Sequence, residues 1–255
     1  MSVLELPIRR FEAPDGLSLA YRELGEGRPL VLLHGYLSTA TDTWLRHGLA
    51  ARIATGGYRV ITPDFRGHGS SAKPRDRLAY PADALVDDGF ALISHLGLVD
   101  YDLGGYSLGG RIVARMLARG ATPTRAIVAG TGLEPIIYAA GRGSRYREIL
   151  ANFGTYDPGS IEWQIEQFVT QVGGDPAALA NVLNTFVDTP REALTRVAVP
   201  TLVVAGVEDG QRGSVQALAA LLPHGRYAPV PGDHFSALMS PELAVAIVDF
   251  LGPPN

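Results

Sequence analysis

The sequence contains no cysteine among its 255 residues. This absence excludes a disulfide framework, thiolate metal sites, iron–sulfur clusters and a cysteine nucleophile. Positive charge is in slight deficit, because Lys and Arg number 22 against 26 for Asp and Glu, and no basic run occurs. We therefore expect no nucleic-acid partner. No stretch approaches the roughly 18 consecutive apolar residues of a membrane span, so we expect no membrane association.

The residues that are abundant indicate a folded domain with many turns. Glycine and proline number 30 and 18 without a fixed period, and apolar residues make up 46% of the chain. This composition excludes collagen-like and disordered proteins, and one α/β domain of roughly 250 residues is common. Residues 1–16 carry several charges and lack the apolar segment of a signal peptide. We expect a soluble, cytoplasmic protein.

Short apolar runs separated by helical patterns predict the fold class. Residues 6–12 and 17–24 flank the turn signal Pro14-Asp15-Gly16, which is typical of an antiparallel hairpin. Continuous apolar runs, typical of strands buried on both faces of a parallel sheet, follow at 29–33, 58–62, 101–105, 125–129, 201–205 and 226–230. Helical patterns begin after Ser107 and at Ser240-Pro241. The sequence predicts an α/β fold: a mostly parallel twisted sheet of about eight strands, with helices on both faces.

The segment 133–190 breaks this alternation. It contains no strand-like run, and its periodicity predicts two helices, one after Ser160 and one after Asp175-Pro176. We expect a small helical insertion, 133–190, within a core formed by 1–132 and 191–255. The segment is rich in aromatic residues, which favours a small or medium apolar or aromatic substrate group. Its arginines are expected to be solvated: Arg142, Arg145 and Arg147.

The strongest chemical signal is the pentapeptide Gly105-Tyr106-Ser107-Leu108-Gly109 between a predicted strand and a predicted helix. A nucleophilic serine on such a tight turn needs small neighbours, because its backbone is strained. A phosphate-binding loop is the alternative, but Gly110-Arg111 stands where Gly-Lys-Ser/Thr is required. No dinucleotide-binding glycine pattern occurs either. We expect Ser107 to be a nucleophile, and we expect neither a cofactor nor a metal.

A serine nucleophile needs a base and an acid to orient the base. His234 lies between the last strand and the last helix, at the sheet edge expected for Ser107. Asp209 follows the strand 201–205 and is the first candidate for the acid, with Glu208 and Glu134 as alternatives. His34 and His68 lie in glycine-flanked turns, where a structural role is expected. The other three histidines, His47, His95 and His224, are expected to face solvent.

An oxyanion hole needs two fixed N–H donors. The amide of Leu108 directly follows the nucleophile, and the amide of Tyr36 lies in the loop after the strand 29–33. The predicted chain order of nucleophile, acid and base is Ser107, Asp209, His234, which is the order expected for a nucleophile elbow on an α/β sheet.

Five motifs together resemble the successive signatures of the α/β-hydrolase fold family. They are His34-Gly35-Tyr36, Asp64-Phe65-Arg66-Gly67-His68-Gly69-Ser70-Ser71, Gly105-Tyr106-Ser107-Leu108-Gly109-Gly110, Gly206-Val207-Glu208-Asp209 and Gly232-Asp233-His234. The resemblance covers nearly the whole chain except 133–190, which would be the variable cap of the family. In this family, epoxide hydrolases and dehalogenases have an aspartate at the elbow, and Ser107 argues against both. The Gly-x-x-Asp pattern of the family favours Asp209 over Glu208.

The resemblance implies a serine hydrolase, and we expect an esterase acting on carboxylic esters through an acyl-enzyme. The sequence leaves two alternatives open. One is hydrolysis of a carbon–carbon bond in diketone-type substrates by the same triad. The other is a receptor-like relative that binds a ligand, with incidental turnover. The oligomeric state has no signature in the sequence.

Overall fold

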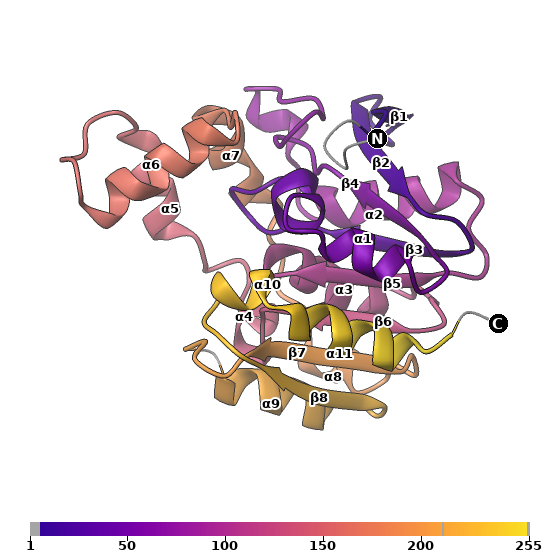
Figure 1. Cartoon of the computed structure of the whole chain (residues 1–255). Helices are drawn as coiled ribbons and strands as arrows, with labels where there is room; N and C mark the ends of the chain where they lie inside the picture. Colours follow the sequence, from indigo (N-terminus) through magenta and orange to yellow (C-terminus); the bar gives the residue numbers. More distant parts are fainter. Residues whose placement is uncertain (1–5, 211, 254–255) are drawn as a thin grey trace.

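The computed structural model describes residues 6–210 and 212–253, and these residues build an eight-stranded sheet with helices around it (Figure 1). The strands lie in the order β1-β2-β4-β3-β5-β6-β7-β8. Their bounds are β1 Arg9–Glu12, β2 Ser18–Leu24, β3 Arg28–Leu33, β4 Tyr58–Pro63, β5 Asp102–Tyr106, β6 Ala126–Ala129, β7 Thr201–Gly206 and β8 Gly225–Val230. Every strand predicted from the apolar runs is present.

The sheet changes from antiparallel to parallel along its width. β1 pairs with β2 antiparallel, as the turn signal predicts, and β2 pairs with β4 antiparallel. From β4 through β3, β5, β6, β7 and β8 all neighbours are parallel. The predicted fold class is confirmed. The first five residues of the charged N-terminal stretch lie outside the described residues.

Helices cover both faces of the sheet because alternate strand residues point to opposite sides. In β3, Val31 and Leu33 join one apolar core, whereas Leu30 and Leu32 join the other. The first core holds side chains of α2 (Ala84–His95), α3 (Leu108–Ala118), α8 (Arg191–Leu194) and α9 (Arg212–Leu221). The second holds side chains of η2 (Thr41–Leu45), α1 (Leu49–Ala54), α10 (Ser236–Met239) and α11 (Pro241–Leu251). The short turn η3 spans Arg77–Ala79. α3 and α11 are the two helices that the sequence predicts after Ser107 and Ser240.

The chain between β6 and β7 is helical, as predicted for 133–190, but it contains more helices than the periodicity indicated. Its elements are α4 (Leu133–Ile137), α5 (Ser144–Ala151), α6 (Ile161–Gln171), α7 (Pro176–Val182) and the turn η4 (Leu183–Thr185). The two predicted helices are α6 and α7. Each is capped as its sequence suggests: Ser160 accepts a hydrogen bond from the Trp163 amide and Asp175 accepts one from the Ala178 amide, over 3.1 and 3.0 Å.

Three helices of this segment, α5, α6 and α7, lie together beyond one end of the sheet (Figure 1). A small apolar cluster joins them to the loop after β3 through the side chains of Leu37, Leu150, Val169 and Leu179. Leu133 and Ile136 of α4, in contrast, belong to the same core as α3, as do several side chains between 178 and 186. The segment is therefore attached at both of its ends, and its division from the core at 133 and 190 stays a prediction.

Candidate active site

Ser107 occupies the sharp turn between β5 and α3. Its backbone angles are φ 55° and ψ −109°, and it is one of three residues other than glycine with positive φ among the described part of the chain. A side chain at positive φ costs of order 1–3 kcal/mol and persists only where the surroundings enforce it. Here the Ser107 N–H donates to the Ala129 carbonyl oxygen of β6 over 2.8 Å, which anchors the turn. The strained turn thus presents the hydroxyl above the carboxyl end of the sheet.

The glycines around Ser107 are required by close packing of backbone against backbone. A Cβ added to Gly105 would lie 2.3 Å from the Gly109 carbonyl carbon. A Cβ on Gly109 would lie 2.1 Å from the Leu33 carbonyl oxygen of β3. The helix can therefore begin directly behind Ser107 only because both positions lack side chains.

Ser107, His234 and Asp209 come together from three separate loops. The Ser107 Oγ lies 3.1 Å from His234 Nε2, and His234 Nδ1 lies 3.0 Å from Asp209 Oδ2. An ionised carboxylate only accepts hydrogen bonds, so Nδ1 donates to Asp209 and Nε2 is left to accept the serine proton. A serine nucleophile, a histidine base and an orienting acid would need contacts of this kind, and the roles of the three residues stay a prediction.

Backbone hydrogen bonds join the loop that carries Asp209 to the loop that carries His234. Val207 N–H donates to the Val230 carbonyl and Glu208 N–H donates to the Gly232 carbonyl, over 2.9 and 3.0 Å. Gly206 approaches so closely that an added Cβ would lie 2.1 Å from the Gly232 oxygen. Asp209 is 6% exposed beneath His234. The register between the two loops thus fixes the spacing of Asp209 and His234.

The two alternative acids lie elsewhere. The side chains of Glu208 and Glu134 are exposed, whereas Asp209 is buried. Within residues 6–210 and 212–253, Asp209 is the carboxylate that hydrogen-bonds the His234 ring. The geometry favours the first candidate, and its role in turnover stays a prediction.

The two expected oxyanion donors flank Ser107. Leu108 is the first residue of α3, where amides have no partner within the helix. Tyr36 follows Gly35, whose added Cβ would lie 3.6 Å from the Ser107 Cβ, so the loop after β3 passes beside Ser107. The Tyr36 hydroxyl donates to the Leu179 carbonyl oxygen over 2.8 Å, which ties this loop to α7. That both amides stabilise an oxyanion stays a prediction.

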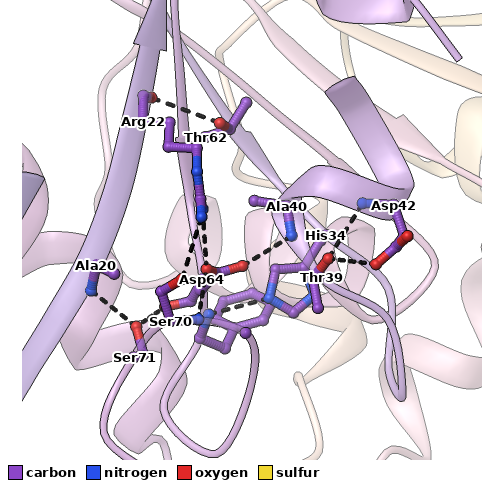
Figure 2. A network of polar contacts seen from close by, with 12 residues as sticks. Ala20, Arg22, His34, Thr39, Ala40, Asp42, Thr62, Asp64, Ser70 and Ser71 are labelled. Atoms are coloured by element: carbon purple, nitrogen blue, oxygen red, sulfur yellow. Dashed lines mark hydrogen bonds and ion pairs between the residues drawn. The ribbon is translucent and has the colours of Figure 1, made fainter. Parts of the chain in front are cut away.

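Asp64 fixes the loop after β3 from behind, at the centre of a polar network (Figure 2). Its carboxylate accepts hydrogen bonds from the amides of Ala40 and Ser70, both over 2.9 Å, and from Arg22 over 3.3 Å. His34 accepts from the Phe65 amide through Nε2 over 3.0 Å, and its Nδ1 lies 2.8 Å from the Gly35 carbonyl oxygen. The Phe65 amide can only donate, so His34 is neutral with its proton on Nδ1. His34 and Asp64 therefore support the loop that carries Tyr36, and neither contacts Ser107 directly.

The two buried histidines predict that stability falls in mild acid. Burial lowers the pKa of His34, and burial together with His34 lowers the pKa of His68 well below its ordinary value. Between the folded and unfolded pKa values the unfolded chain binds protons that the folded protein does not. The free energy of unfolding should therefore fall below about pH 6.5, by up to about 1.4 kcal/mol per pH unit for each histidine. Urea denaturation at pH 5.0 to 8.0 measures this slope.

Two variants test whether a buried histidine causes the pH dependence of the free energy of unfolding. His68→Gln should make the pH dependence shallower, and His47→Gln, which changes an exposed histidine, should leave it unchanged. A slope that is the same in the wild-type protein and in His68→Gln would contradict the assignment to His68.

A cavity of about 890 Å³ opens between the three candidate residues and the helices of 133–190. Ser107 and His234 line it together with Tyr36 and Arg111. The remaining wall is mainly apolar and comes largely from that segment: Pro135, Tyr146, Ile161, Ile165, Phe168, Leu183 and Phe186. Arg142 and Arg145 are exposed, as expected for solvated side chains, but both also line the cavity. A substrate held at Ser107 would thus contact both the sheet edge and the helical segment.

Arg111 also lines the cavity, although no motif in the sequence marks it as functional. It follows Ser107 by four positions, and this spacing places two residues on the same helix face. The spacing is the feature of the sequence that indicates a position near Ser107. Among the described residues, no cluster of three or more His, Asp or Glu side chains is arranged to hold a metal ion. None of the described helices has both the length and the apolar character needed to cross a bilayer.

Comparison with known proteins identifies similar sequences and structures. Residues 28–140 match the sequence model of the alpha/beta hydrolase fold. A non-heme haloperoxidase from Rhodococcus erythropolis is 39% identical over 107 residues, which cover 42% of this chain and 37% of that protein. The chain thus matches little more than a third of the length of this curated relative.

Solved structures match over almost the full length. A thermophilic esterase from Thermogutta terrifontis superposes with a TM-score of 0.78 at 24% identity, covering 96% of this chain and 98% of that one. An esterase from a Rhodococcus species gives a TM-score of 0.74 at 24% identity, with both chains covered in full (100%). At this level of identity the similarity establishes the fold.

Proposed function

The chain belongs to the α/β-hydrolase fold family, and on that premise we propose that it is a serine hydrolase that cleaves carboxylic esters. One observation carries the proposal: the Ser107, His234 and Asp209 side chains are joined by contacts of 3.1 and 3.0 Å at the mouth of a cavity. A curated relative named epoxide hydrolase and a solved structure named esterase support hydrolysis as the general activity.

In the proposed reaction, Ser107 Oγ attacks the ester carbonyl carbon while His234 Nε2 takes the hydroxyl proton. The carbonyl oxygen becomes negatively charged and accepts hydrogen bonds from the amides of Tyr36 and Leu108. The tetrahedral intermediate then breaks its bond to the alkoxy oxygen. His234 returns the proton to that oxygen, and the alcohol leaves behind an acyl-enzyme on Ser107.

The second half of the reaction repeats these steps with water. His234 removes a proton from water, the hydroxide oxygen attacks the acyl carbon, and the bond to Ser107 Oγ breaks as Oγ regains its proton. Asp209 keeps the imidazole ring in place and stabilises its positive charge in both halves. We propose that 133–190 acts as a cap whose apolar wall receives the apolar or aromatic body of the ester, a small-molecule substrate.

Covalent labelling tests the proposal directly. A fluorophosphonate probe should label Ser107, as identified by mass spectrometry of the modified peptide, and Ser107→Ala should abolish both labelling and hydrolysis of an activated ester. A panel of p-nitrophenyl esters of increasing chain length then gives kcat/KM for each acyl group. Ser107→Ala with wild-type turnover would overturn the proposal.

The same measurements separate the alternatives. Hydrolysis of a diketone with no ester turnover would indicate carbon–carbon bond cleavage by the triad. An unlabelled Ser107, combined with a melting temperature raised by a small ligand, would indicate a binding protein.

A further inference from the structure

Arg111 places a positive charge in the cavity beside the triad. It lies one helical turn after Ser107 on α3, and its backbone N–H donates to the Ser107 carbonyl oxygen over 3.1 Å. Residues four apart share a helix face, and Arg111, Ser107 and His234 all line the same cavity. A substrate bound at Ser107 therefore occupies a cavity that Arg111 also lines.

Arg111 differs from the next two arginines of α3. Arg115 pairs with Asp83 over 2.7 Å, and Arg119 pairs with Asp87 over 2.8 Å. In the part of the chain that the structure describes, the Arg111 guanidinium has no ion pair and no side-chain hydrogen bond. Its Cζ lies 4.4 Å from the ring centroid of Phe186. Stacking on a ring occupies one face of the guanidinium plane, and the N–H groups, which point outward in that plane, stay available.

The side chains around Arg111 do not supply the negative charge that would balance it. Arg142 also lines the cavity, whereas Arg145 is already paired with Glu162 over 2.8 Å. The cavity's carboxylate, Asp209, is engaged by His234. Burial and the like charge of Arg142 lower the pKa of Arg111 to about 10, so the side chain remains protonated at neutral pH but without a counter-ion. An anion that enters the cavity would act as the counter-ion of Arg111 and would offset both the burial of its charge and the repulsion from Arg142.

We propose that Arg111 binds a carboxylate carried by the substrate, so that the preferred esters are hemiesters of dicarboxylic acids. This inference rests on the proposed function and specifies its substrate class. The planar fork of a guanidinium matches the two oxygens of one carboxylate and forms charge-assisted hydrogen bonds with it. Arg142 contributes a second positive charge from the side of 133–190. The apolar wall around Ile165 and Leu183 then receives the carbon chain between the ester and the carboxylate.

Kinetics on a matched pair of esters tests the proposal. The p-nitrophenyl hemiester of glutaric acid and its neutral methyl diester share the same diacid chain and differ in the charge and in one methyl group. Wild-type protein should hydrolyse the hemiester with the higher kcat/KM. Arg111→Met should lower kcat/KM for the hemiester by about 10- to 100-fold, the loss expected for a hydrogen bond to a charged group, and leave the neutral diester within about twofold.

Two further variants control for charge and folding. Arg111→Lys keeps the charge without the fork and should retain part of the preference. Arg119→Met removes an arginine of the same helix that pairs with Asp87, and should leave the ratio of the two ester rates unchanged. An equal loss on both esters in Arg111→Met, or a wild-type protein without preference for the hemiester, would overturn the inference.

A binding measurement keeps this inference separate from the proposed function. Glutarate should raise the melting temperature of the wild-type protein and inhibit labelling of Ser107, and should do neither in Arg111→Met. Inorganic phosphate at the same concentration should have the smaller effect, and a larger effect of phosphate would contradict the assignment to a carboxylate. Failure of ester hydrolysis with intact glutarate binding would overturn the proposed function alone. Ester hydrolysis without glutarate binding would overturn the carboxylate site alone.

Discussion

Replacing Asp209 with asparagine is expected to lower kcat for ester hydrolysis about 10⁴-fold, by analogy with other serine triads. Asp209 Oδ2 accepts the hydrogen bond of His234 Nδ1 over 3.0 Å, which leaves Nε2 unprotonated 3.1 Å from Ser107 Oγ. An amide NH₂ group in the same place donates to Nδ1 instead, so the ring proton moves to Nε2. His234 then cannot accept the serine proton, although the side chains keep their positions.

Steady-state kinetics and the rate of fluorophosphonate labelling both measure this effect. The matched control is Glu208→Gln, which removes the charge of the exposed neighbour and should leave kcat within about twofold. Asp209→Asn should retain the wild-type melting temperature within a few degrees, because the two side chains have nearly the same shape. More than a tenth of wild-type kcat in Asp209→Asn would show that another group orients His234.

The strands of this protein could be predicted well because burial on both faces leaves a local mark in the sequence. Residues 29–33 and 201–205 are continuous apolar runs, and the structure places them in β3 and β7. The segment 133–190 was harder to predict. α5 buries only Ile149 and Leu150, so its sequence has no full apolar stripe to indicate a helix. α4 is only five residues long, too short for a periodicity to be recognised.

The candidate triad could be located from sequence because each member lies next to a strand end and a glycine. Parallel strands bring their carboxyl ends to one edge, so residues far apart in the chain meet there. The environment of Arg111 could not be predicted in this way. Arg111, Arg115 and Arg119 recur at the same spacing, and only the position of α2, which carries Asp87 and begins after Asp83, determines which of them are paired. A side chain's lack of a partner is a property of the tertiary structure.

Replacing Gly109 with alanine is expected to destabilise the protein by at least about 3 kcal/mol, a large effect for one methyl group. The added Cβ would lie 2.1 Å from the Leu33 carbonyl oxygen and 2.9 Å from the His34 oxygen. Both contacts are with backbone, which cannot move aside like a flexible side chain. Relief requires α3 to shift away from β3, and this shift moves Ser107 and Leu108 relative to the loop that carries Tyr36.

Urea denaturation measures the loss of stability, and ester kinetics measure the effect of the displaced Ser107 and Leu108 on activity. Gly141→Ala is the stability control, because a Cβ at Gly141 has no heavy atom within 4 Å, and its free energy of unfolding should stay within about 0.5 kcal/mol of wild type. Gly109→Ala should also lower kcat by about 10²-fold or more in the fraction that remains folded, the loss expected when one oxyanion donor is displaced. If Gly109→Ala were as stable as Gly141→Ala and as active as the wild-type protein, the close contact between α3 and the end of β3 would not be needed to align Ser107 with the proposed oxyanion donors.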